Sequence, residues 1–427
     1  MAIARGSDRR LFDLRGAPEK RSAQPERRVA RRPSRARARC YPSNGCISVT
    51  TLPDLLELEQ LWRELDAHAS NPSLFRSWDF TIEWLRHFVL GQVGGATGRF
   101  EVAVAFDANA RAIGAVPMFE ERALGVAGLG LSLQPFGRSH SLESMTDEPT
   151  VLLRHGQEQA ATRKLTAHMG RRIGVGNWDI ATLPGGPHPG EAARRSFSWS
   201  SGLDHVELTR TVAGPMVVAL PHSWEAFAAG LSKSMRDNVA YYPRRLTREV
   251  GTWTLRTART RGDVTAATEQ LVQLHRRRSR SRTGVAHRDH IPTDTHASFL
   301  RAWFARLAAR SEISIHTIEI GGTTIAAQAF LETPDGVSVY YSGYDDRYHR
   351  YSPLTVITAH LIRTAITRGV RWLEFPPGAT PWKSRWGAVE GRELDEVSIY
   401  AVRLPALLRG LSRRLRLRLA SVFPMPA

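Results

Sequence analysis

The chain has 427 residues, of which 42% are hydrophobic, and it carries a formal net charge of +18 at pH 7. This length predicts two or three domains, and the hydrophobic content is typical of globular domains with packed cores. No stretch approaches the roughly 18 consecutive apolar residues of a membrane-spanning helix, and no apolar segment of a secretory signal follows the first residues. We therefore expect a cytoplasmic protein without a transmembrane helix.

Half of the net charge lies in residues 1–46, which contain 13 Lys and Arg against 4 Asp and Glu. We predict that this segment is a disordered basic tail. It can act as an arm for nucleic acid or anionic lipid, or it can be an unselected leader, and both interpretations stay open. Only four of the 59 basic residues are lysines, which indicates a coding bias toward arginine more than a nucleic-acid surface. Cys40 and Cys46 are the only cysteines, which argues against a disulfide framework or a thiolate metal site.

The first half of the chain predicts alternating helices and strands. Apolar residues with helical spacing cover 53–69, 78–90 and 158–173. Strands are predicted at 100–106, 112–119, 129–136, 149–153 and 178–183, followed by a Pro/Gly loop at 185–190.

The second half repeats this order. We expect helices at 223–231, 263–278 and 295–309, and a basic helix at 234–250 that is interrupted at Pro243. A strand at 253–257 precedes a strand pair, 314–320 and 324–331, which flanks a Gly321-Gly322 turn. The same strand–turn–strand pattern occurs at 100–119, so we interpret the chain as one α/β unit used twice. The predicted domains are 47–213 and 214–405, followed by a C-terminal segment, 406–427.

The segment 337–386 carries the strongest functional signal. A strand at 337–341 leads to a Tyr351-Ser352-Pro353 corner, a helix that ends at Gly369, and a strand at 371–375. Such a βαβ unit places main-chain N–H groups where a phosphate can bind. In the alternative interpretation, Ser352 and Pro353 only cap the helix.

Several motifs together resemble a known family. They are the basic segment 231–246, the Ile325-Ala326-Ala327-Gln328 strand, Tyr341-Ser342-Gly343-Tyr344-Asp345 with Tyr351-Ser352-Pro353, and the segment 375–386. The pattern is similar to that of GNAT-superfamily acetyltransferases of the CelD/BioF2 type, relatives of the FemAB aminoacyl transferases. The resemblance implies two GNAT-like domains, each a mixed and mostly antiparallel sheet flanked by helices. It also implies transfer of an acyl group from acetyl-CoA or another acyl-CoA to an amine, without a metal.

The chain departs from this family pattern at three places. Leu354 replaces a glycine of the corner, Gly378-Ala379-Thr380 lacks an acidic residue, and Trp382 replaces a tyrosine. A donor that approaches the backbone closely has less room at Leu354, and the missing carboxylate and phenol leave the catalytic assignment open.

The resemblance and the chemistry of the side chains predict which residues bind the donor and which act in catalysis. The candidate donor-binding residues are Tyr344, Arg350, Tyr351, Ser352, Pro353, Leu354 and Thr355, with the N–H groups of Leu354 and Thr355 as phosphate donors. Glu374, between Leu373 and Phe375, is a candidate general base if burial raises its pKa, although an ion pair with an arginine is the favoured alternative. Asp345 is a second candidate base, and a plain turn is its alternative.

Candidate acceptor-binding residues are Lys233, Arg236, Asn238, Lys383 and Trp386. Lys383 and Trp386 can equally pack as a Trp-rich turn, and the basic helix can be a solvated face. His287, His290 and His296 are predicted to be solvated and not to bind metal. The basic amphipathic segment 403–419 can lie on an anionic membrane surface or dock on the body as a terminal helix.

Three functions stay open at this stage. The first is an acyl-CoA-dependent N-acyltransferase acting on a small-molecule, saccharide or peptide amine, with a role in envelope or exopolysaccharide biosynthesis suggested by the resemblance. The second is a FemAB-like aminoacyl-tRNA-dependent transferase, for which the basic surface would bind RNA. The third is a degenerate GNAT fold that serves as a binding or scaffold protein. The sequence indicates no oligomeric state.

Overall fold

The computed structural model describes residues 45–401, except 71–72, 126–127, 140, 142, 144, 147–149, 176–177, 179, 188–197, 202–204, 282–286 and 392–393. The predicted basic tail lies outside the described residues up to position 44, as does the predicted amphipathic segment 403–419. Cys46 belongs to the first strand and is buried, so the fold begins at the end of the predicted tail. None of the described helices is long and apolar enough to cross a membrane.

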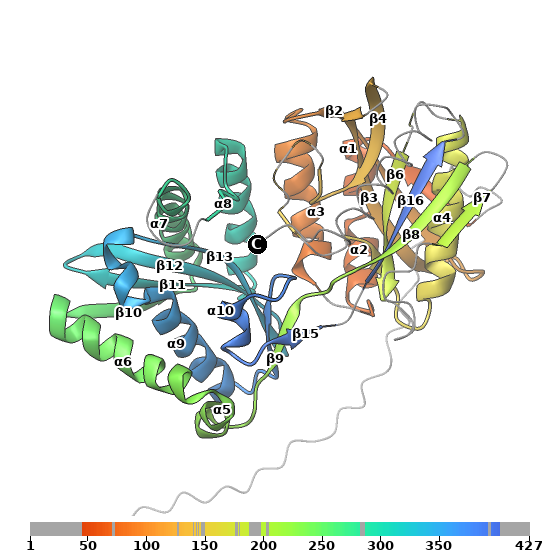
Figure 1. Ribbon diagram of the computed structural model, residues 1–427. Helices are drawn as coiled ribbons and strands as arrows, with labels where there is room; N and C mark the ends of the chain where they lie inside the picture. The colour runs from red at the N-terminus through yellow and green to blue at the C-terminus, as the bar shows by residue number, and fades with distance from the viewer. Residues whose placement is uncertain are drawn as a thin grey trace, which may run out of the picture. The chain divides into compact units, whose positions relative to one another are not determined.

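The first half forms most of a nine-stranded sheet (Figure 1). Its elements are β1 (Cys46–Val49), α1 (Leu52–Leu56), α2 (Glu59–Asp66), η2 (Leu74–Arg76), α3 (Trp78–Trp84), the π-helical turn η3 (Leu85–Val89), β2 (Ala96–Phe106), β3 (Ala112–Gly125), β4 (Gly128–Pro135), β5 (Leu152–Leu153), α4 (Glu158–Val175), β6 (Ile180–Pro187), β7 (Ser198–Ser201) and β8 (His205–Val212). The strand order is β1-β2-β3-β4-β6-β16-β8-β7, with β5 beside β3. The Pro/Gly segment that was predicted as a loop is strand as far as Pro187, because it pairs with β16.

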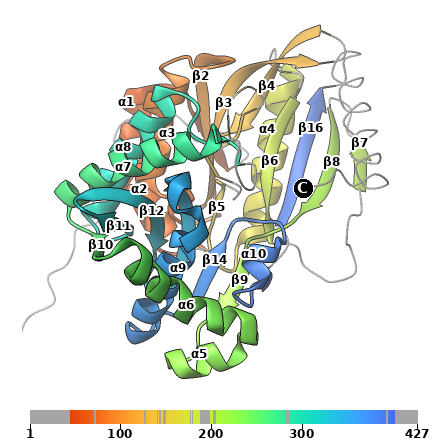
Figure 2. The ribbon, with the colours of Figure 1, turned by 60° about the vertical axis from the view of Figure 1, so that its left-hand side comes forward.

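The second half forms a seven-stranded sheet in the order β10-β11-β12-β13-β14-β9-β15. Figure 1 labels β13 and β15, and Figure 2 shows β10, β11, β12, β14 and β9 from another side. Its elements are β9 (Met216–Ala219), α5 (Trp224–Gly230), α6 (Lys233–Val250), β10 (Trp253–Ala258), α7 (Arg261–Ser279), α8 (Asp294–Ala308), β11 (Ile313–Ile320), β12 (Thr323–Glu332), β13 (Gly336–Tyr344), η5 (Asp346–Tyr351), α9 (Pro353–Thr367), β14 (Trp372–Phe375), α10 (Pro381–Ser384), β15 (Val389–Glu390) and β16 (Leu394–Ala401).

The last described strand corrects the predicted division of the chain. β16 was assigned to the second domain, but it pairs antiparallel with β6 and β8 of the first sheet. A strand is placed by the long-range partner that buries its apolar face, and Val397 and Ile399 pack with α4 residues such as Leu165.

The two halves repeat one connection. β4 and β6 pair in parallel and are joined through α4, and β13 and β14 pair in parallel and are joined through α9. The antiparallel pairs β2–β3 and β11–β12 occupy corresponding places. The structure therefore contains the repeated α/β unit that the sequence predicts.

Serine and threonine side chains start most of the helices that position the second sheet. Ser232 Oγ accepts a hydrogen bond from the Met235 N–H (3.2 Å) at the start of α6, and Thr260 and Thr293 do the same for α7 and α8. The predicted interruption at Pro243 is wrong, because α6 continues through it to Val250. Packing of the buried α6 face, which includes Met235, Val239 and Leu246, holds the helix together despite the missing proline N–H.

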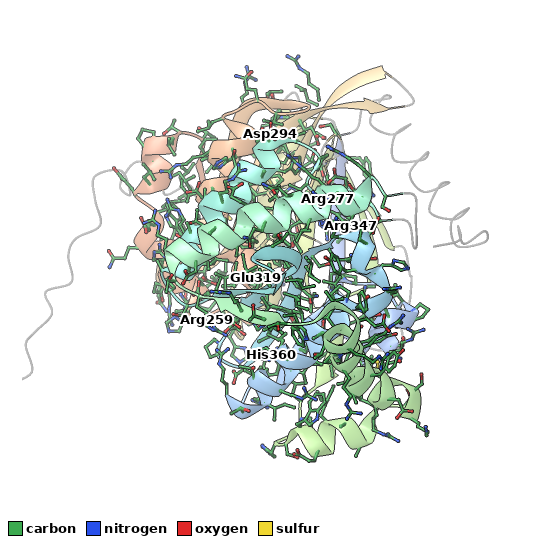
Figure 3. All side chains as sticks on the ribbon, turned by 90° about the vertical axis from the view of Figure 1, so that its left-hand side faces the viewer. Arg259, Arg277, Asp294, Glu319, Arg347 and His360 are labelled. Atoms are coloured by element: carbon green, nitrogen blue, oxygen red, sulfur yellow. The ribbon has the colours of Figure 1, made fainter. Side chains whose placement is uncertain are left out.

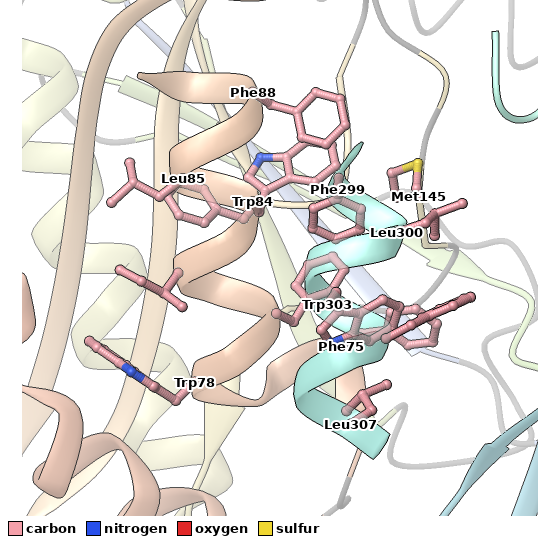
Figure 4. Close-up of a cluster of buried hydrophobic side chains, with 14 of the residues drawn as sticks. Phe75, Trp78, Trp84, Leu85, Phe88, Met145, Phe299, Leu300, Trp303 and Leu307 are labelled. Atoms are coloured by element: carbon pink, nitrogen blue, oxygen red, sulfur yellow. The ribbon is translucent and has the colours of Figure 1, made fainter. Parts of the chain in front are cut away.

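An aromatic core joins α3 to α8 (Figure 4). Trp84 stacks on Phe88 with ring centroids 4.2 Å apart, and Phe80 meets Trp303 edge to face at 5.1 Å. Trp303 is fully buried, and truncating a tryptophan of this kind costs about 3–5 kcal/mol. Both halves of the chain therefore share one rigid core, which supports the elements around the candidate site.

Candidate functional site in the second sheet

The centre of the second sheet contains two strands that separate. β13 pairs with β14 only through Gly336–Ser338, opposite Trp372–Glu374. On its other side β13 stays paired with β12 as far as Tyr344, and Tyr340 and Tyr341 together oppose Ala329. This extra residue is a β-bulge, which bends a strand away from its neighbour. Past Ser338, within the described chain, the β14-side edge of β13 has no strand partner, so its main-chain groups can bind an extended ligand.

Helix α7 lies directly against the end of β13. A Cβ atom on Gly343 would lie 2.3 Å from the His275 nitrogen and 2.5 Å from the Leu274 carbonyl carbon, so only glycine fits there. This close approach lets His275 Nδ1 donate a hydrogen bond to the Ser342 carbonyl at 2.9 Å. The helix thus holds the bulged part of the strand in place.

The start of α9 offers fewer donors than the sequence predicts. Ser352 has a left-handed backbone (φ 43°, ψ 56°), and its side chain makes no capping hydrogen bond. Its carbonyl accepts the N–H groups of Thr355 (2.9 Å) and Val356 (3.3 Å), and Pro353 has no N–H. The Thr355 N–H is therefore already used, and the Leu354 N–H is the first-turn donor that has no partner among the described residues.

Two guanidinium groups flank Tyr351 at this helix start. Their Cζ atoms lie 4.9 Å (Arg350) and 5.4 Å (Arg245) from the ring centroid, and Arg350 donates to the Tyr351 hydroxyl at 2.6 Å. Glu249 accepts a hydrogen bond from Arg245 at 3.0 Å, which raises the pKa of Arg245. Arg350 lies 3.6 Å and Arg248 lies 3.1 Å from the same carboxylate, so this corner carries three positive charges against one negative charge. Its electrostatic character suits an anionic ligand.

A search against family models matches residues 233–384 to the acetyltransferase (GNAT) domain. A search of solved structures finds FemX, with a TM-score of 0.51 and 6% identity over 79% of this chain and 95% of that one. The chain therefore has a fold like that of FemX, and its second half matches a GNAT domain.

Two further structures resemble this GNAT fold at lower scores. One is a tandem GNAT protein from the clavulanic acid biosynthesis pathway, with a TM-score of 0.42 and 12% identity over 83% of this chain and 98% of that one. The other is the C-terminal domain of a putative lysylphosphatidylglycerol synthetase from Agrobacterium fabrum, with a TM-score of 0.41 and 8% identity over 78% of this chain and 92% of that one. A search of curated proteins finds no match.

Asp345 of the GNAT domain is not suited to act as a base. Arg347 donates to its carboxylate at 2.7 Å, and Arg277 of α7 donates at 3.0 Å. The hydrogen bonds from Arg347 hold the pKa of Asp345 below its usual value. Both arginines are labelled in Figure 3, Arg277 on α7 and Arg347 on η5. The predicted catalytic role of Asp345 is therefore replaced by a structural one, because an ion-paired carboxylate with a low pKa accepts a proton poorly.

Tyr344, a predicted donor-binding residue, lies under an arginine. The Arg278 guanidinium carbon is 4.7 Å from the centroid of its ring, and burial lowers the pKa of Arg278. Tyr344 is next to Asp345 in the sequence, and Arg278 follows Arg277, the partner of Asp345, on α7.

Glu374 lies at the closed end of the strand separation, as the last residue of β14 paired with β13. It is half-buried, and Ser338 Oγ donates to it at 2.8 Å. Leu373 and Phe375, its neighbours along the strand, are both buried in the core on the α9 side.

The predicted acceptor-binding residues do not gather with the donor corner. Lys233 is exposed and pairs with Asp237 at 2.8 Å, and Arg236 donates to the Leu231 carbonyl. Twelve residues separate Lys233 from Arg245 on α6, which is about 18 Å along a helix. No described partner holds Asn238, which is half-buried on the same first turns.

Lys383 and Trp386 have structural roles in place of the predicted anion and substrate contacts. Lys383 Nζ donates to the carbonyls of Pro376 (2.8 Å), Pro377 (3.1 Å) and Gly378 (2.8 Å). An ammonium group has three protons, so these three bonds use all of them. Trp386 is 1% exposed and packs in the core of the second sheet.

A histidine cluster beside the β13 bulge corrects the prediction of solvated histidines for His287 and His296, whereas the His290 side chain is 39% exposed. His275 is 1% exposed, its ring lies 4.9 Å from that of His287, and its Nε2 accepts the His290 N–H at 3.1 Å. Burial lowers the pKa of His275 to about 4 and that of His287 to about 3. His296 is fully buried against Phe88. Within the described ranges, no group of His, Cys, Asp or Glu residues could hold a metal ion.

The sequence contained a signal for one member of this cluster. His275 continues the buried stripe of α7, which includes Val264, Thr268 and Leu271 at helical spacing. It could therefore have been predicted to face the sheet. Glu143, whose carboxylate lies 2.6 Å from His290 Nδ1 in this cluster, comes from the first half and had no such signal.

Proposed function

We propose that the protein is an acyl-CoA-dependent N-acyltransferase that transfers an acyl group, in the simplest case acetyl, to an amine acceptor. The observation that carries the proposal is the separation of β13 from β14 next to the start of α9. An extended pantetheine chain fits along the open edge of β13, because its amides can bond to the unpaired main chain as a neighbouring strand would.

The donor's phosphates would then lie at the start of α9, beside Arg245 and Arg350. There the Leu354 N–H and the positive end of the α9 dipole would attract the phosphates, and the two arginines add positive charge. Tyr351 and Pro353 are buried and fix this corner, while Ser352 supplies its left-handed turn. Tyr344 and Thr355 belong to the same proposed donor site, Tyr344 through its arginine contact and Thr355 through its hydrogen bond to Ser352.

Acyl transfer to an amine needs a proton acceptor as well as positioning. Asp345 is occupied by its ion pairs, so Glu374 is the carboxylate candidate that stays in place beside the separated strands. Analogy with the family suggests a saccharide or peptide amine in envelope or exopolysaccharide biosynthesis, in the cytoplasm where acyl-CoA is made.

Calorimetry with acetyl-CoA tests the donor site. We expect a micromolar dissociation constant for the wild type and at least tenfold weaker binding for Ser352→Asp, which corresponds to about 1.4 kcal/mol. Ser352→Asn is the matched control, because asparagine also tolerates the left-handed backbone but adds no charge. Equal affinities for the two variants, or no binding of acetyl-CoA by the wild type together with tight and salt-dependent tRNA binding, would refute the proposal.

A second function is favoured by the hydrogen bonds of Asp345 and Lys383, which leave these two polar groups without a catalytic task. In that case the protein is a GNAT fold that binds an acyl-CoA without transferring its acyl group. Release of free CoA thiol from acetyl-CoA in the presence of primary amines distinguishes the two, since only a transferase produces it.

A further inference from the structure

A histidine–carboxylate pair connects the two halves of the chain beside the β13 bulge. His290 Nδ1 lies 2.6 Å from Glu143 Oε1, and Arg288 lies 2.6 Å from the other oxygen of the same carboxylate. A carboxylate only accepts hydrogen bonds, so Nδ1 of the neutral ring carries the proton and Nε2 carries the lone pair. Nε2 has no partner within the described chain, and the His290 side chain is 39% exposed.

The main chain of His290 is fixed to the bulge on both sides. Its N–H donates to His275 Nε2 at 3.1 Å, and His275 Nδ1 in turn donates to the Ser342 carbonyl at 2.9 Å. Its carbonyl accepts the Tyr341 hydroxyl at 3.5 Å, and Tyr341 is one of the two bulge residues. The main chain of His290 is therefore held beside the part of β13 whose edge is open, and its ring contacts those of His275 and His287.

We propose that His290, oriented by Glu143, is the general base that removes a proton from the amine acceptor, in place of Glu374, whose carboxylate already accepts a hydrogen bond from Ser338. The inference rests on the proposed acyl-CoA transfer. Nε2 takes one proton from the ammonium form of the acceptor, and the freed nitrogen lone pair forms the C–N bond with the thioester carbonyl. The C–S bond then breaks, and the sulfur leaves as the thiolate of CoA. The attacking nitrogen loses its second proton to the thiolate, which gives the neutral amide and the CoA thiol, and His290 releases the first proton to solvent.

The other imidazoles of the cluster do not suit this role. Both ring nitrogens of His275 are hydrogen-bonded, and burial lowers its pKa to about 4, which makes it a weak base. Burial likewise lowers the pKa of His287 to about 3. The charged and titratable groups around His290 are Glu143, Arg288, Asp289, His275 and His287.

Kinetics with acetyl-CoA and a panel of primary amines, followed by thiol release, provide the first test. His290→Gln should lower kcat by about 10²–10⁴, with the KM for acetyl-CoA and the calorimetric Kd unchanged. Glu143→Gln should lower kcat by a smaller factor, also without a change in KM or Tm, because Glu143 is a positioning residue. His155→Gln is the matched control, since His155 is exposed and lies 3.8 Å from Glu158 in a His–Glu pair that has no contact with β13.

Modification by diethyl pyrocarbonate, read by mass spectrometry, needs no acceptor. His290 should react at Nε2 faster than His275, and bound acetyl-CoA should slow its reaction. Failure of the wild type to bind acetyl-CoA would overturn the proposed function itself. If acetyl-CoA binds but does not protect His290, or if His290→Gln keeps the full rate of thiol release, the role of His290 alone is overturned.

Discussion

Gly343→Ala should destabilise the protein strongly, although it adds one methyl group. The new Cβ would lie 2.3 Å from the His275 nitrogen and 2.5 Å from the Leu274 carbonyl carbon, both main-chain atoms of α7. Real contacts of this kind are essentially never shorter than 3.0 Å, so α7 and β13 must move apart. Overpacking of this kind costs about 1–3 kcal/mol, and α7 cannot relieve it by rotating a side chain.

Thermal denaturation of Gly343→Ala should therefore show a Tm lower by roughly 2–12 °C. Gly230→Ala is the matched control, because no atom lies within 4 Å of its Cβ and alanine is favoured in a helix such as α5. That control should match the wild type or exceed it by up to about 1 kcal/mol. A Gly343→Ala protein as stable as the wild type would refute the close packing of α7 on β13, and with it the geometry that fixes His275 to Ser342.

Three further outcomes are expected. Lys383→Met should lower the free energy of unfolding by about 1–3 kcal/mol in urea titrations, because three carbonyls lose their hydrogen-bond donor. The affinity for acetyl-CoA should stay within twofold of the wild type. A large loss of affinity would instead support the predicted anion-binding role of Lys383. For Glu332, burial alone would raise the pKa, but hydrogen bonds from Arg259, Ser314 and Arg368 lower it. The stability that Glu332→Gln removes should therefore be present at pH 7, begin to fall near the unfolded pKa of about 4.3, and be lost as the pH falls further through the lower folded pKa; a loss that is independent of pH would contradict this. Burial lowers the pKa of His316 to about 3, and neither of its ring nitrogens has a hydrogen-bond partner among the described residues. The wild type should therefore lose about 2 kcal/mol more than His316→Phe between pH 7.5 and pH 5; parallel stability curves would show that His316 is not buried in its neutral form.

Local signals were sufficient to predict the βαβ unit of the second half. Helical spacing over 354–366 and Gly369 predicted α9 and its end, and Gly369 indeed has the positive φ (76°) of a helix terminus. β14 was predicted within one residue at its start. These features depend on residues close in sequence, which is why a single sequence specifies them.

The features that the sequence did not predict depend on partners that are far apart in the sequence. β16 joins a sheet formed almost entirely by residues before 213, and Glu143 reaches His290 across 147 positions. Nothing in the residues next to Glu143 indicates that contact. The predicted roles of Asp345 and Lys383 disagree with the structure for the same reason. Asp345 accepts hydrogen bonds from an arginine, and Lys383 donates to three carbonyls, and the motifs themselves do not indicate these partners.

The repeated connection also explains why we place the donor in one half only. α4 and α9 occupy corresponding positions after a strand, and both present the positive end of a helix dipole. The first turn of α4 contains Glu158, whose carboxylate neutralises that end and repels a phosphate. The first turn of α9 contains no acidic residue, and Arg245 and Arg350 lie beside it. The same architecture thus favours an anion in the second half and disfavours it in the first, which leaves the first half to supply the core and Glu143.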